Sequence, residues 1–336
     1  MSLCSVVICH HKGDFLTACI KSLRDSVGAT LEIIVVTSMP ASKRPRWEAD
    51  KVIHSLAGPS EKRNIGATYA KGKYLFFLDD DTEVDKEFLL RMSLAMDKSH
   101  VGMVYGKTYN MERRRMLDNA GSYLTWTGFL WAREESGKIE DNGQFDAPEE
   151  IFAGKGAAMA LRRDTFDKVG GFDPIYEILA EETDISWKVW FIGEKVMWVP
   201  DAILYHAFNT KFKPWSYFYT QKRVYFNGCK NYILMLAKFM EWPNLLRVLP
   251  FHIFVWFLAG LGMLLTGKWE AGLLIWKGIL YHLNPINILD TLKRRKKVQD
   301  LRTLPDHELF QTIMRQPKFS FYWHRFWHYI KTGQHG

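Results

Sequence analysis

The N-terminal two thirds of the chain alternate short apolar runs with segments of helical periodicity. Residues 4–10 (CSVVICH) and 31–38 (LEIIVVTS) are rich in Val and Ile, which is the pattern of buried parallel strands. Between them, residues 14–26 carry apolar side chains at helical spacing. The alternation continues with a helix in 60–72 after a Ser60 cap, a strand in 73–81, a helix in 85–96 and a strand in 101–109. This pattern predicts an α/β fold with an open, mostly parallel sheet and helices on both faces.

The pattern is interrupted and then resumes. Residues 110–150 are polar, and we interpret them as a long irregular excursion. Residues 152–174 predict a strand, a short helix and a Gly-Gly turn, and residues 181–193 predict a helix that ends at a glycine. A last pair of strands is expected within 195–206.

Charge divides the chain near residue 210. Residues 1–210 hold 26 Lys and Arg against 31 Asp and Glu, a net of −5. Residues 211–336 hold 19 against six, a net of +13, together with seven of the 13 tryptophans. We therefore predict a catalytic domain over 1–210 and a basic, aromatic-rich helical region over 211–336 that meets an anionic surface, either nucleic acid or a phospholipid leaflet.

The cysteine pattern argues against a domain held together by disulfides and against one held together by zinc. Cys4, Cys9, Cys19 and Cys229 form no CxxC pair, so neither a disulfide framework nor a zinc site is indicated. The N-terminal residues become polar too quickly for a signal peptide and predict a first strand instead. A reduced, cytosolic compartment fits these features.

Three aspartates, Asp79, Asp80 and Asp81, follow the apolar run KYLFFL. Adjacent carboxylates repel one another, and in an open α/β sheet they would lie beyond the strand ends, where ligands bind. Such a cluster is typical of a site for Mg²⁺ or Mn²⁺ that in turn holds phosphates. The alternative is an acidic start to the helix that follows, and the triplet alone does not decide between the two.

A phosphohydrolase of the haloacid dehalogenase type also ends an early strand with two alternating aspartates. That pattern requires a Thr or Val two residues beyond the second aspartate, where this chain has Glu83. A metal-dependent phosphohydrolase or nucleotidyltransferase on a similar sheet therefore stays as the alternative. A nucleic-acid-binding protein is a third class, but no RNA- or DNA-reading motif is present, and the aspartates would have no role in it.

The ordered series of motifs over residues 3–207 resembles family 2 glycosyltransferases with the GT-A, Rossmann-like fold. The motifs are SVVICHHKGDFLTACIKSL, EIIVVTS, KRNIGATYAKGKYLFFLDDDTEV, GKGAAMALRRDTFDKVGGFDP, EETDISWKVWFIG and VPDAILYH. The resemblance implies an inverting enzyme that uses a nucleotide-diphosphate sugar and a divalent metal, Mn²⁺ or Mg²⁺.

The same resemblance assigns roles to the acidic cluster. The family's Asp-x-Asp element binds the nucleotide sugar and its metal, so that Asp79 would reach the ribose, Asp81 would hold the metal, and Asp80 lies between them. Asp79 is also implied to be a metal ligand. A His after the last strand often completes the metal shell, and His206 has that place. Without the resemblance, a lone His after an apolar run is more often structural.

The EETD motif matches the family's Glu-Asp pair, which supplies the general base for the acceptor hydroxyl. Glu182 matches the base and Glu181 precedes it, but the usual Asp is replaced by Glu, so the choice between them stays open. The alternative is that Glu181, Glu182 and Asp184 only favour the start of a helix, where negative charge is stabilised.

Four further positions are implied to contact the donor. His10 and Asp14 lie in the loop expected at base and ribose, Arg63 stands where a basic residue lies near the diphosphate, and Gly156 belongs to the acceptor-side strand. Two of them have a plainer interpretation, namely a solvated charge for Arg63 and a tight turn for Gly156.

Two apolar segments of the C-terminal region, 249–267 and 271–289, are near or below the length of a membrane span. Their Trp and Tyr residues and the flanking KRRKK at 293–297 are typical of a lipid headgroup layer. We interpret them as helices that lie in the membrane surface, or as a short hairpin with both basic flanks on the cytoplasmic side of the inner membrane. The expected acceptor is a lipid-linked glycan or another saccharide. The oligomeric state is not predicted.

Overall fold

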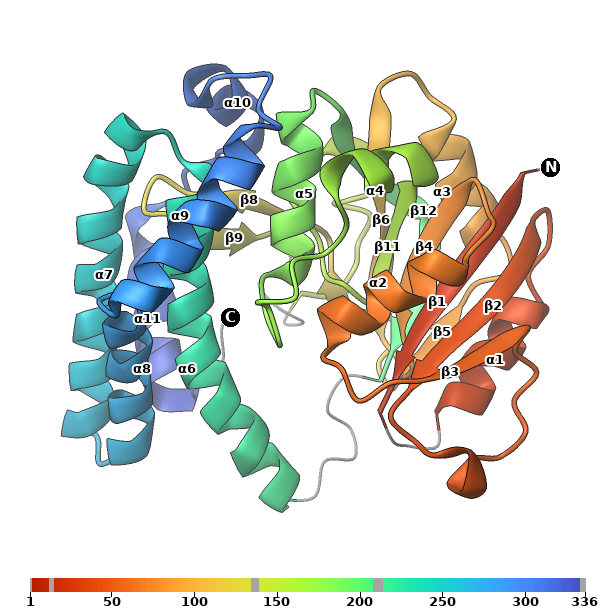
Figure 1. Cartoon of the computed structure of the whole chain (residues 1–336), viewed down its shortest axis with the longest axis horizontal. Coiled ribbons are helices and arrows are strands. Elements are labelled where there is room, and N and C mark those ends of the chain that lie inside the picture. The colour runs from red at the N-terminus through yellow and green to blue at the C-terminus, as the bar shows by residue number, and fades with distance from the viewer. Residues whose placement is uncertain (1, 12–14, 134–138, 208–213, 333–336) are drawn as a thin grey trace. The chain divides into compact units, whose positions relative to one another are not determined.

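The computed structural model describes residues 2–11, 15–133, 139–207 and 214–332, with side chains from residue 222 onward in the last range. The described chain forms two compact units (Figure 1). Unit one comprises Met1–Ser122, Ala132–Glu177 and Glu181–Thr210, whereas unit two comprises Tyr123–Trp131, Ile178–Ala180 and Lys211–Gly336. That residues 1–210 and 211–336 act as separate domains stays a prediction.

Unit one is built on a ten-stranded sheet in the order β10-β12-β6-β11-β4-β1-β2-β3, with β5 paired to β12 and β7 paired to β6. The strands are β1 (Leu3–His10), β2 (Thr30–Thr37), β3 (Lys51–His54), β4 (Tyr74–Asp79), β5 (Thr82–Val84), β6 (Val101–Asn110), β7 (Leu117–Asn119), β10 (Glu149–Glu150), β11 (Ala158–Arg162) and β12 (Lys195–His206). The half formed by β3, β2, β1 and β4 is wholly parallel. Of these strands, β1, β2 and β4 are largely buried on both faces, as their near-continuous apolar runs predict.

Helices cover both faces of this sheet. They are α1 (Leu16–Arg24), α2 (Pro59–Tyr69), α3 (Phe88–Met96), α4 (Arg163–Val169) and α5 (Glu181–Phe191), with a short 3₁₀ turn at Ala41–Lys43. Alternate residues of a strand point to opposite faces, so Phe76 packs toward Phe88 of α3 and Phe77 stacks on Phe166 of α4. The predicted α/β fold with a two-sided sheet is confirmed.

Three local predictions were wrong. Residues 110–150 are not an irregular excursion, because they contain β7, β10 and two further short strands at 122–124 and 130–132. Strands of two or three residues leave no readable periodicity. Residues 195–206 form one strand, whose register shifts between Val199 and Ile203. The second helix begins at Pro59, and Ser60 does not cap it, since its hydroxyl donates to the carbonyl of Tyr176.

Unit two is helical. Its helices are α6 (Pro214–Phe239), α7 (Trp242–Leu265), α8 (Trp269–Tyr281), α9 (Pro285–Gln299), α10 (Asp306–Ile313) and α11 (Phe319–Thr332), accompanied by the two-stranded sheet of β8 (Ser122–Leu124) and β9 (Leu130–Ala132). Small residues let α7 and α8 approach closely, because a Cβ on Gly272 would lie 2.7 Å from the carbonyl oxygen of Gly260. The helical character predicted for this region is confirmed.

The segment 271–289 is not one helix. Pro285 begins α9, because a residue without a backbone N–H is accepted at the first position of a helix and not in its interior. The preceding α8 has 13 residues and is therefore about 20 Å long, which is shorter than the roughly 30 Å of a bilayer core. Within the described residues, α7 alone is long and apolar enough to cross a membrane, judged by length and composition.

Candidate functional site

The three predicted metal ligands lie together at one edge of the sheet. Asp79 ends β4 beside the end of β1, and the pairing of β5 with β12 places His206 opposite Thr82. One ligand atom from each of Asp79, Asp81 and His206 lies within 4.8 Å of the others. The Nε2 atom of His206 is 3.2 Å from the Oδ1 atom of Asp81. The tertiary fold thus joins residues that are more than 120 positions apart in the sequence.

This donor set fits a divalent cation. Carboxylate oxygens suit Mg²⁺ and Mn²⁺, and the imidazole nitrogen favours the transition metal of the two. Burial lowers the pKa of His206, but hydrogen bonds to Asp118 and Asp81 outweigh burial and raise this pKa to about 10. Without a metal, the protonated ring of His206 supplies the positive charge between Asp81 and Asp118. When a metal is bound, the metal would supply this positive charge and the ring would be neutral.

Asp118 is a residue of this cluster that sequence reasoning missed. Its Oδ2 atom lies 2.9 Å from Nδ1 of His206, and its Oδ1 atom accepts a hydrogen bond of 2.7 Å from Lys155. Burial raises the pKa of Asp118, but Lys155 and His206 together hold it well below its usual range. No local signal marks Asp118, because β7 is recognisable only by its pairing with β6. An acceptor on the far nitrogen of a metal-binding His fixes the orientation of the ring.

We expect Asp118→Asn to weaken Mn²⁺ binding by about 10- to 100-fold, the usual effect of removing a carboxylate behind a ligating His. Electron paramagnetic resonance of free Mn²⁺ measures this directly. Asp141→Asn is the matched control, since the side chain of Asp141 is 9% exposed against 7% for Asp118 but pairs with Lys107. Equal Mn²⁺ affinities of the Asp118→Asn protein and the unmodified protein would contradict a role for Asp118 in orienting His206.

Arg63 joins the acidic cluster to the EETD motif. Its side chain is 3% exposed, and its two terminal nitrogens lie 3.2 Å from Asp79 Oδ1 and 3.1 Å from Glu181 Oε1. The interpretation of Arg63 as a solvated charge is therefore wrong. Gly156 lies against the same guanidinium, because a Cβ there would come within 3.1 Å of Arg63 Nη2. The glycine thus leaves room for the arginine that holds Asp79 and Glu181 together.

The structure separates the two glutamates of EETD by their environments. Glu181 forms an ion pair with Arg63, whereas the carboxyl group of Glu182 is buried next to the negative charge of Glu181. Burial raises the pKa of Glu182 well above its ordinary value, and the neighbouring charge of Glu181 raises it further, although Arg63 partly opposes both effects. A carboxyl group with a raised pKa is a better proton acceptor once it is ionised. That Glu182 is the general base stays a prediction, and the raised pKa of its buried carboxyl group is compatible with that role.

The end of β1 forms the other side of the cluster. His10 is buried, with Nδ1 2.8 Å from the hydroxyl of Thr37 and Nε2 3.8 Å from Asp80. Burial raises the pKa of Asp80 to about 7, with further contributions from Asp81 and Asp79. Sequence reasoning missed Lys62, whose Nζ donates to the His10 carbonyl at 2.9 Å.

One predicted residue, Asp14, lies outside the described residues. That the remaining residues contact a nucleotide sugar stays a prediction.

Comparisons with known proteins agree with this fold. A polypeptide N-acetylgalactosaminyltransferase 11 from Xenopus tropicalis is 24% identical over 235 residues, which are 63% of this chain and 39% of the relative. The O-antigen biosynthesis protein RfbC from Myxococcus xanthus is 26% identical over 148 residues, 43% of this chain and 12% of the relative. The chain thus spans less than two thirds of the length of these relatives.

A crystal structure of GalNAc-T7 with UDP, GalNAc and Mn²⁺ superimposes with a TM-score of 0.62 at 16% identity, covering 95% of this chain and 57% of that one. This likeness confirms the GT-A fold that the motif series implies. The family model for glycosyl transferase family group 2 matches residues 74–289, from β4 through the helices of unit two into α9. Because this match covers well over half of its length, the chain belongs to glycosyl transferase family group 2.

Proposed function

We propose that the protein is an inverting glycosyltransferase that transfers a sugar from a nucleotide-diphosphate sugar to an acceptor hydroxyl. The observation that carries this proposal is the arrangement around Arg63. This residue holds Asp79 of the cation-binding cluster and Glu181, the neighbour of the candidate base, in one buried network. Donor binding and proton removal would then occur at one edge of the sheet. Family membership argues against the phosphohydrolase and nucleotidyltransferase alternative.

The proposed reaction is a single displacement at the anomeric carbon. Glu182 accepts the proton of the acceptor hydroxyl, and the acceptor oxygen forms its bond to the anomeric carbon from the face opposite the phosphate. The bond between that carbon and the phosphate oxygen breaks, and the nucleoside diphosphate leaves with the electron pair. A single displacement inverts the configuration. Proton NMR of the first product formed shows which anomer is made, and retention would contradict this role of Glu182.

Asp79, Asp81 and His206 are the residues that would hold Mn²⁺ or Mg²⁺. When bound, the metal would neutralise the developing charge of the leaving diphosphate. Arg63 keeps the carboxylate of Asp79 oriented, and Asp118 keeps the ring of His206 oriented. The Mn²⁺ and UDP named for the GalNAc-T7 structure support this choice of metal and donor class.

Calorimetric titration tests the donor class. We expect one of UDP, GDP or dTDP to bind with an affinity that rises at least tenfold when Mn²⁺ is present, whereas CMP, a monophosphate, should not. The same titrations in EDTA give the metal-free reference. Absence of binding by all four nucleotides, with and without Mn²⁺, would contradict the proposal and favour the phosphohydrolase alternative.

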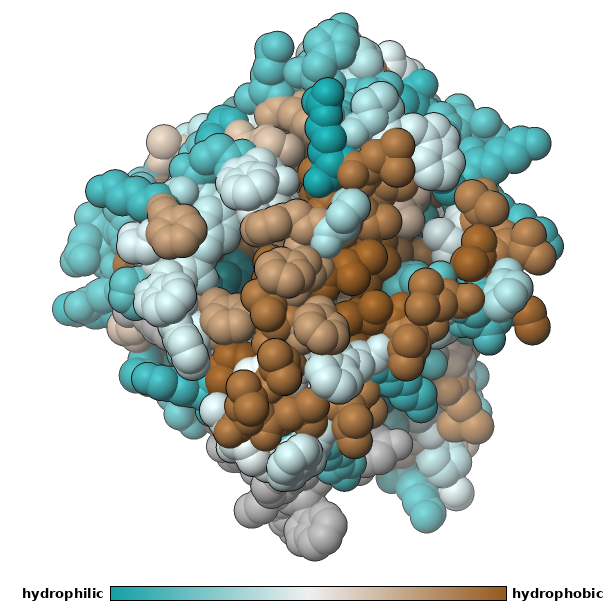
Figure 2. All heavy atoms as spheres, turned by 90° about the vertical axis from the view of Figure 1, so that its left-hand side faces the viewer, coloured by the Kyte–Doolittle hydropathy of each residue, from teal (hydrophilic) through white to brown (hydrophobic). Residues whose placement is uncertain are grey.

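We further propose that the acceptor is a lipid-linked glycan or related saccharide and that the protein binds the cytoplasmic face of the cell membrane peripherally. Figure 2 shows apolar side chains gathered over the face on which α7 and α8 lie. The exposed apolar residues of these helices and of α9 include Leu246, Leu265, Trp269, Leu273, Leu280, Ile286 and Leu289. Contiguous apolar surface of this kind marks an interaction site, and the net charge of +13 over 211–336 favours an anionic leaflet. The relationship to an O-antigen biosynthesis protein supports a cell-surface glycan as the product.

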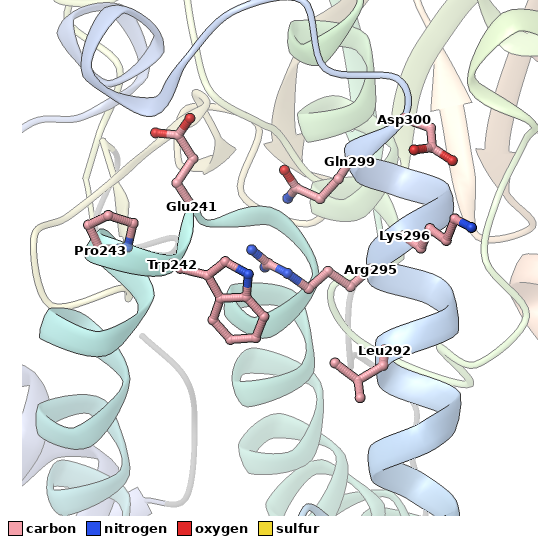
Figure 3. A pocket seen from close by; sticks show the side chains of 8 residues that line it. All are labelled: Glu241, Trp242, Pro243, Leu292, Arg295, Lys296, Gln299 and Asp300. Carbon is pink, nitrogen blue, oxygen red and sulfur yellow. The ribbon is translucent and has the colours of Figure 1, made fainter.

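An open pocket of about 640 Å³ lies between the start of α7 and α9. Its lining combines apolar, aromatic and charged side chains, as the lipid headgroup layer of a membrane requires. The side chains of Trp242 and Arg295 point toward one another there, with the guanidinium carbon 4.3 Å from the ring centroid (Figure 3). Arg295 also donates to the carbonyls of Ala237 and Met240 at the end of α6, which fixes its position. Aromatic and cationic side chains together are typical of residues at a membrane interface.

We expect the triple variant Lys293→Gln, Lys296→Gln, Lys297→Gln to bind anionic vesicles about 100-fold more weakly, at roughly 1 kcal/mol per exposed lysine. Sedimentation with phosphatidylglycerol vesicles at low salt measures the bound fraction. The control replaces three exposed lysines of unit one, Lys21, Lys71 and Lys98, by Gln. An equal loss of binding in this control would mean that overall charge, not the surface of α9, is responsible.

A further inference from the structure

An apolar groove of about 490 Å³ lies wholly within unit two. Its three walls are the turn between β8 and β9, one side of α7, and the segment that leads into and forms α11. Aromatic side chains dominate the lining, among them Trp126, Phe129, Phe251, Phe254, Trp323 and Phe326. The volume and the mainly apolar lining are those of a small-molecule site.

The walls are tied to one another by specific contacts, so the groove is preformed. His252 of α7 donates from Nδ1 to the carbonyl of Thr127 at 2.8 Å and accepts at Nε2 from the indole of Trp256 at 3.0 Å. Phe129 stacks on the same imidazole with ring centroids 4.0 Å apart. On the other side, the backbone N–H of Arg315 donates to the carbonyl of Leu124 at 2.9 Å.

The lining is open to solvent. Trp126, Phe254 and Trp323 are 51%, 54% and 56% exposed, although each stands in a wall that the contacts above hold in place. Contiguous exposed aromatic surface is unfavourable in water and marks a surface that a ligand covers. The groove offers few polar side chains to a sugar, which needs several hydrogen-bonding partners, so its occupant is an apolar group.

Charge identifies the other end of this occupant. The three segments that build the groove, 123–131, 242–265 and 309–332, contain no Asp or Glu. They contain five cations, Arg247, Arg315, Lys318, Arg325 and Lys331. Of these cations, Arg325 belongs to the lining, with its guanidinium carbon 5.6 Å from the ring of Phe321, and the described residues that line the groove include no acidic side chain. A groove with apolar walls and a cationic lining residue is complementary to an amphiphile with an anionic head group.

We propose that this groove binds the hydrocarbon chain of a phosphate-headed lipid, with the chain against the aromatic walls and the phosphate against the cations of α11 and its approach. The proposal rests on the proposed function, because a lipid-linked acceptor has this chemistry. It goes further than membrane association, since it assigns one lipid chain to one set of residues.

Calorimetry on the full chain with soluble amphiphiles below their micelle concentration tests the groove without a membrane. We expect dodecyl phosphate to bind saturably, dodecyltrimethylammonium to bind at least tenfold more weakly, and inorganic phosphate not to bind. Phe254→Asp should weaken dodecyl phosphate binding at least tenfold. Leu246→Asp is the matched control, because Leu246 is also an exposed apolar residue of α7 but does not line the groove. Trp323→Ala, on α11, repeats the test if Phe254→Asp does not fold.

Three outcomes would overturn the proposal. Equal binding of the two amphiphiles would contradict the preference for an anionic head group. Equal losses of binding in Phe254→Asp and Leu246→Asp would contradict the assignment of the hydrocarbon chain to the groove. A dimer in sedimentation velocity that Phe254→Asp dissociates would show that a second copy of the chain covers this surface. Nucleotide titration of the same proteins keeps the two proposals apart, since the groove can bind dodecyl phosphate whether or not the sheet edge binds a nucleotide.

Discussion

The Asp81→Ala protein is expected to lose metal-dependent nucleotide binding and, with it, sugar transfer by about 10³-fold or more. Asp81 is one of three residues whose ligand atoms lie within 4.8 Å of one another, and His206 already contacts it. Removing the carboxylate leaves two ligands, which hold Mn²⁺ weakly, so the charge on the leaving diphosphate is no longer neutralised. Calorimetric titration of the nucleotide with and without Mn²⁺ measures the effect.

Asp201→Ala is the control for this substitution. Asp201 is an exposed carboxylate on β12, the strand that also carries His206, but it belongs to no cluster of potential metal ligands among the described residues. Its removal should leave nucleotide binding unchanged within a factor of two. Tight Mn²⁺-dependent nucleotide binding by the Asp81→Ala protein would contradict the assignment of the metal to this cluster.

The Glu182→Gln protein is expected to keep nucleotide binding and to lose transfer by about 10²- to 10⁴-fold, the usual contribution of a general base. The amide has nearly the shape of the carboxyl group but cannot accept the acceptor proton. The comparison of calorimetry with the transfer rate separates the two effects. Glu177→Gln, an exposed glutamate five positions earlier in the chain, is the control, and a similar loss of transfer there would contradict the assignment.

The pH profile distinguishes Glu182 from Glu181. Because the pKa of Glu182 is raised, the transfer rate of the unmodified protein should rise with pH as this carboxyl group loses its proton. Glu181→Gln removes a negative charge that raises the pKa of Glu182, so the rising limb should move to lower pH. In Glu182→Gln the limb should disappear. If Glu181→Gln abolished the limb instead, Glu181 would be the base.

Much of unit one could be predicted from the sequence because its central strands, β1 and β4 among them, are buried on both faces. Continuous Val, Ile and Phe runs between amphipathic helices permit few arrangements other than an open α/β sheet, and such a sheet places Asp79 and Asp81 at its ligand-binding edge. The position of His206 at the end of an apolar run, read with the family resemblance, was enough to place it with these aspartates.

The excursion at 110–150 was misread because its elements are too short to have a period. Leu117–Asn119 is a strand only because β6 supplies its hydrogen-bonding partners. Asp118, which orients His206, was lost with it. Residues 123–131 were missed for the same reason, although they form a wall of the groove in unit two.

The sequence by itself determined which chemical groups the protein has and the ends of which elements carry them. Strand and helix periods, turn residues and the Asp-x-Asp spacing are local properties, so they can be read along the chain. Only the tertiary structure decided which group contacts which. Arg63 lies 16 positions before Asp79 and 118 before Glu181, yet one guanidinium binds both. A buried ion pair depends on the distance between its atoms and on the exclusion of water around them, and no local pattern specifies either.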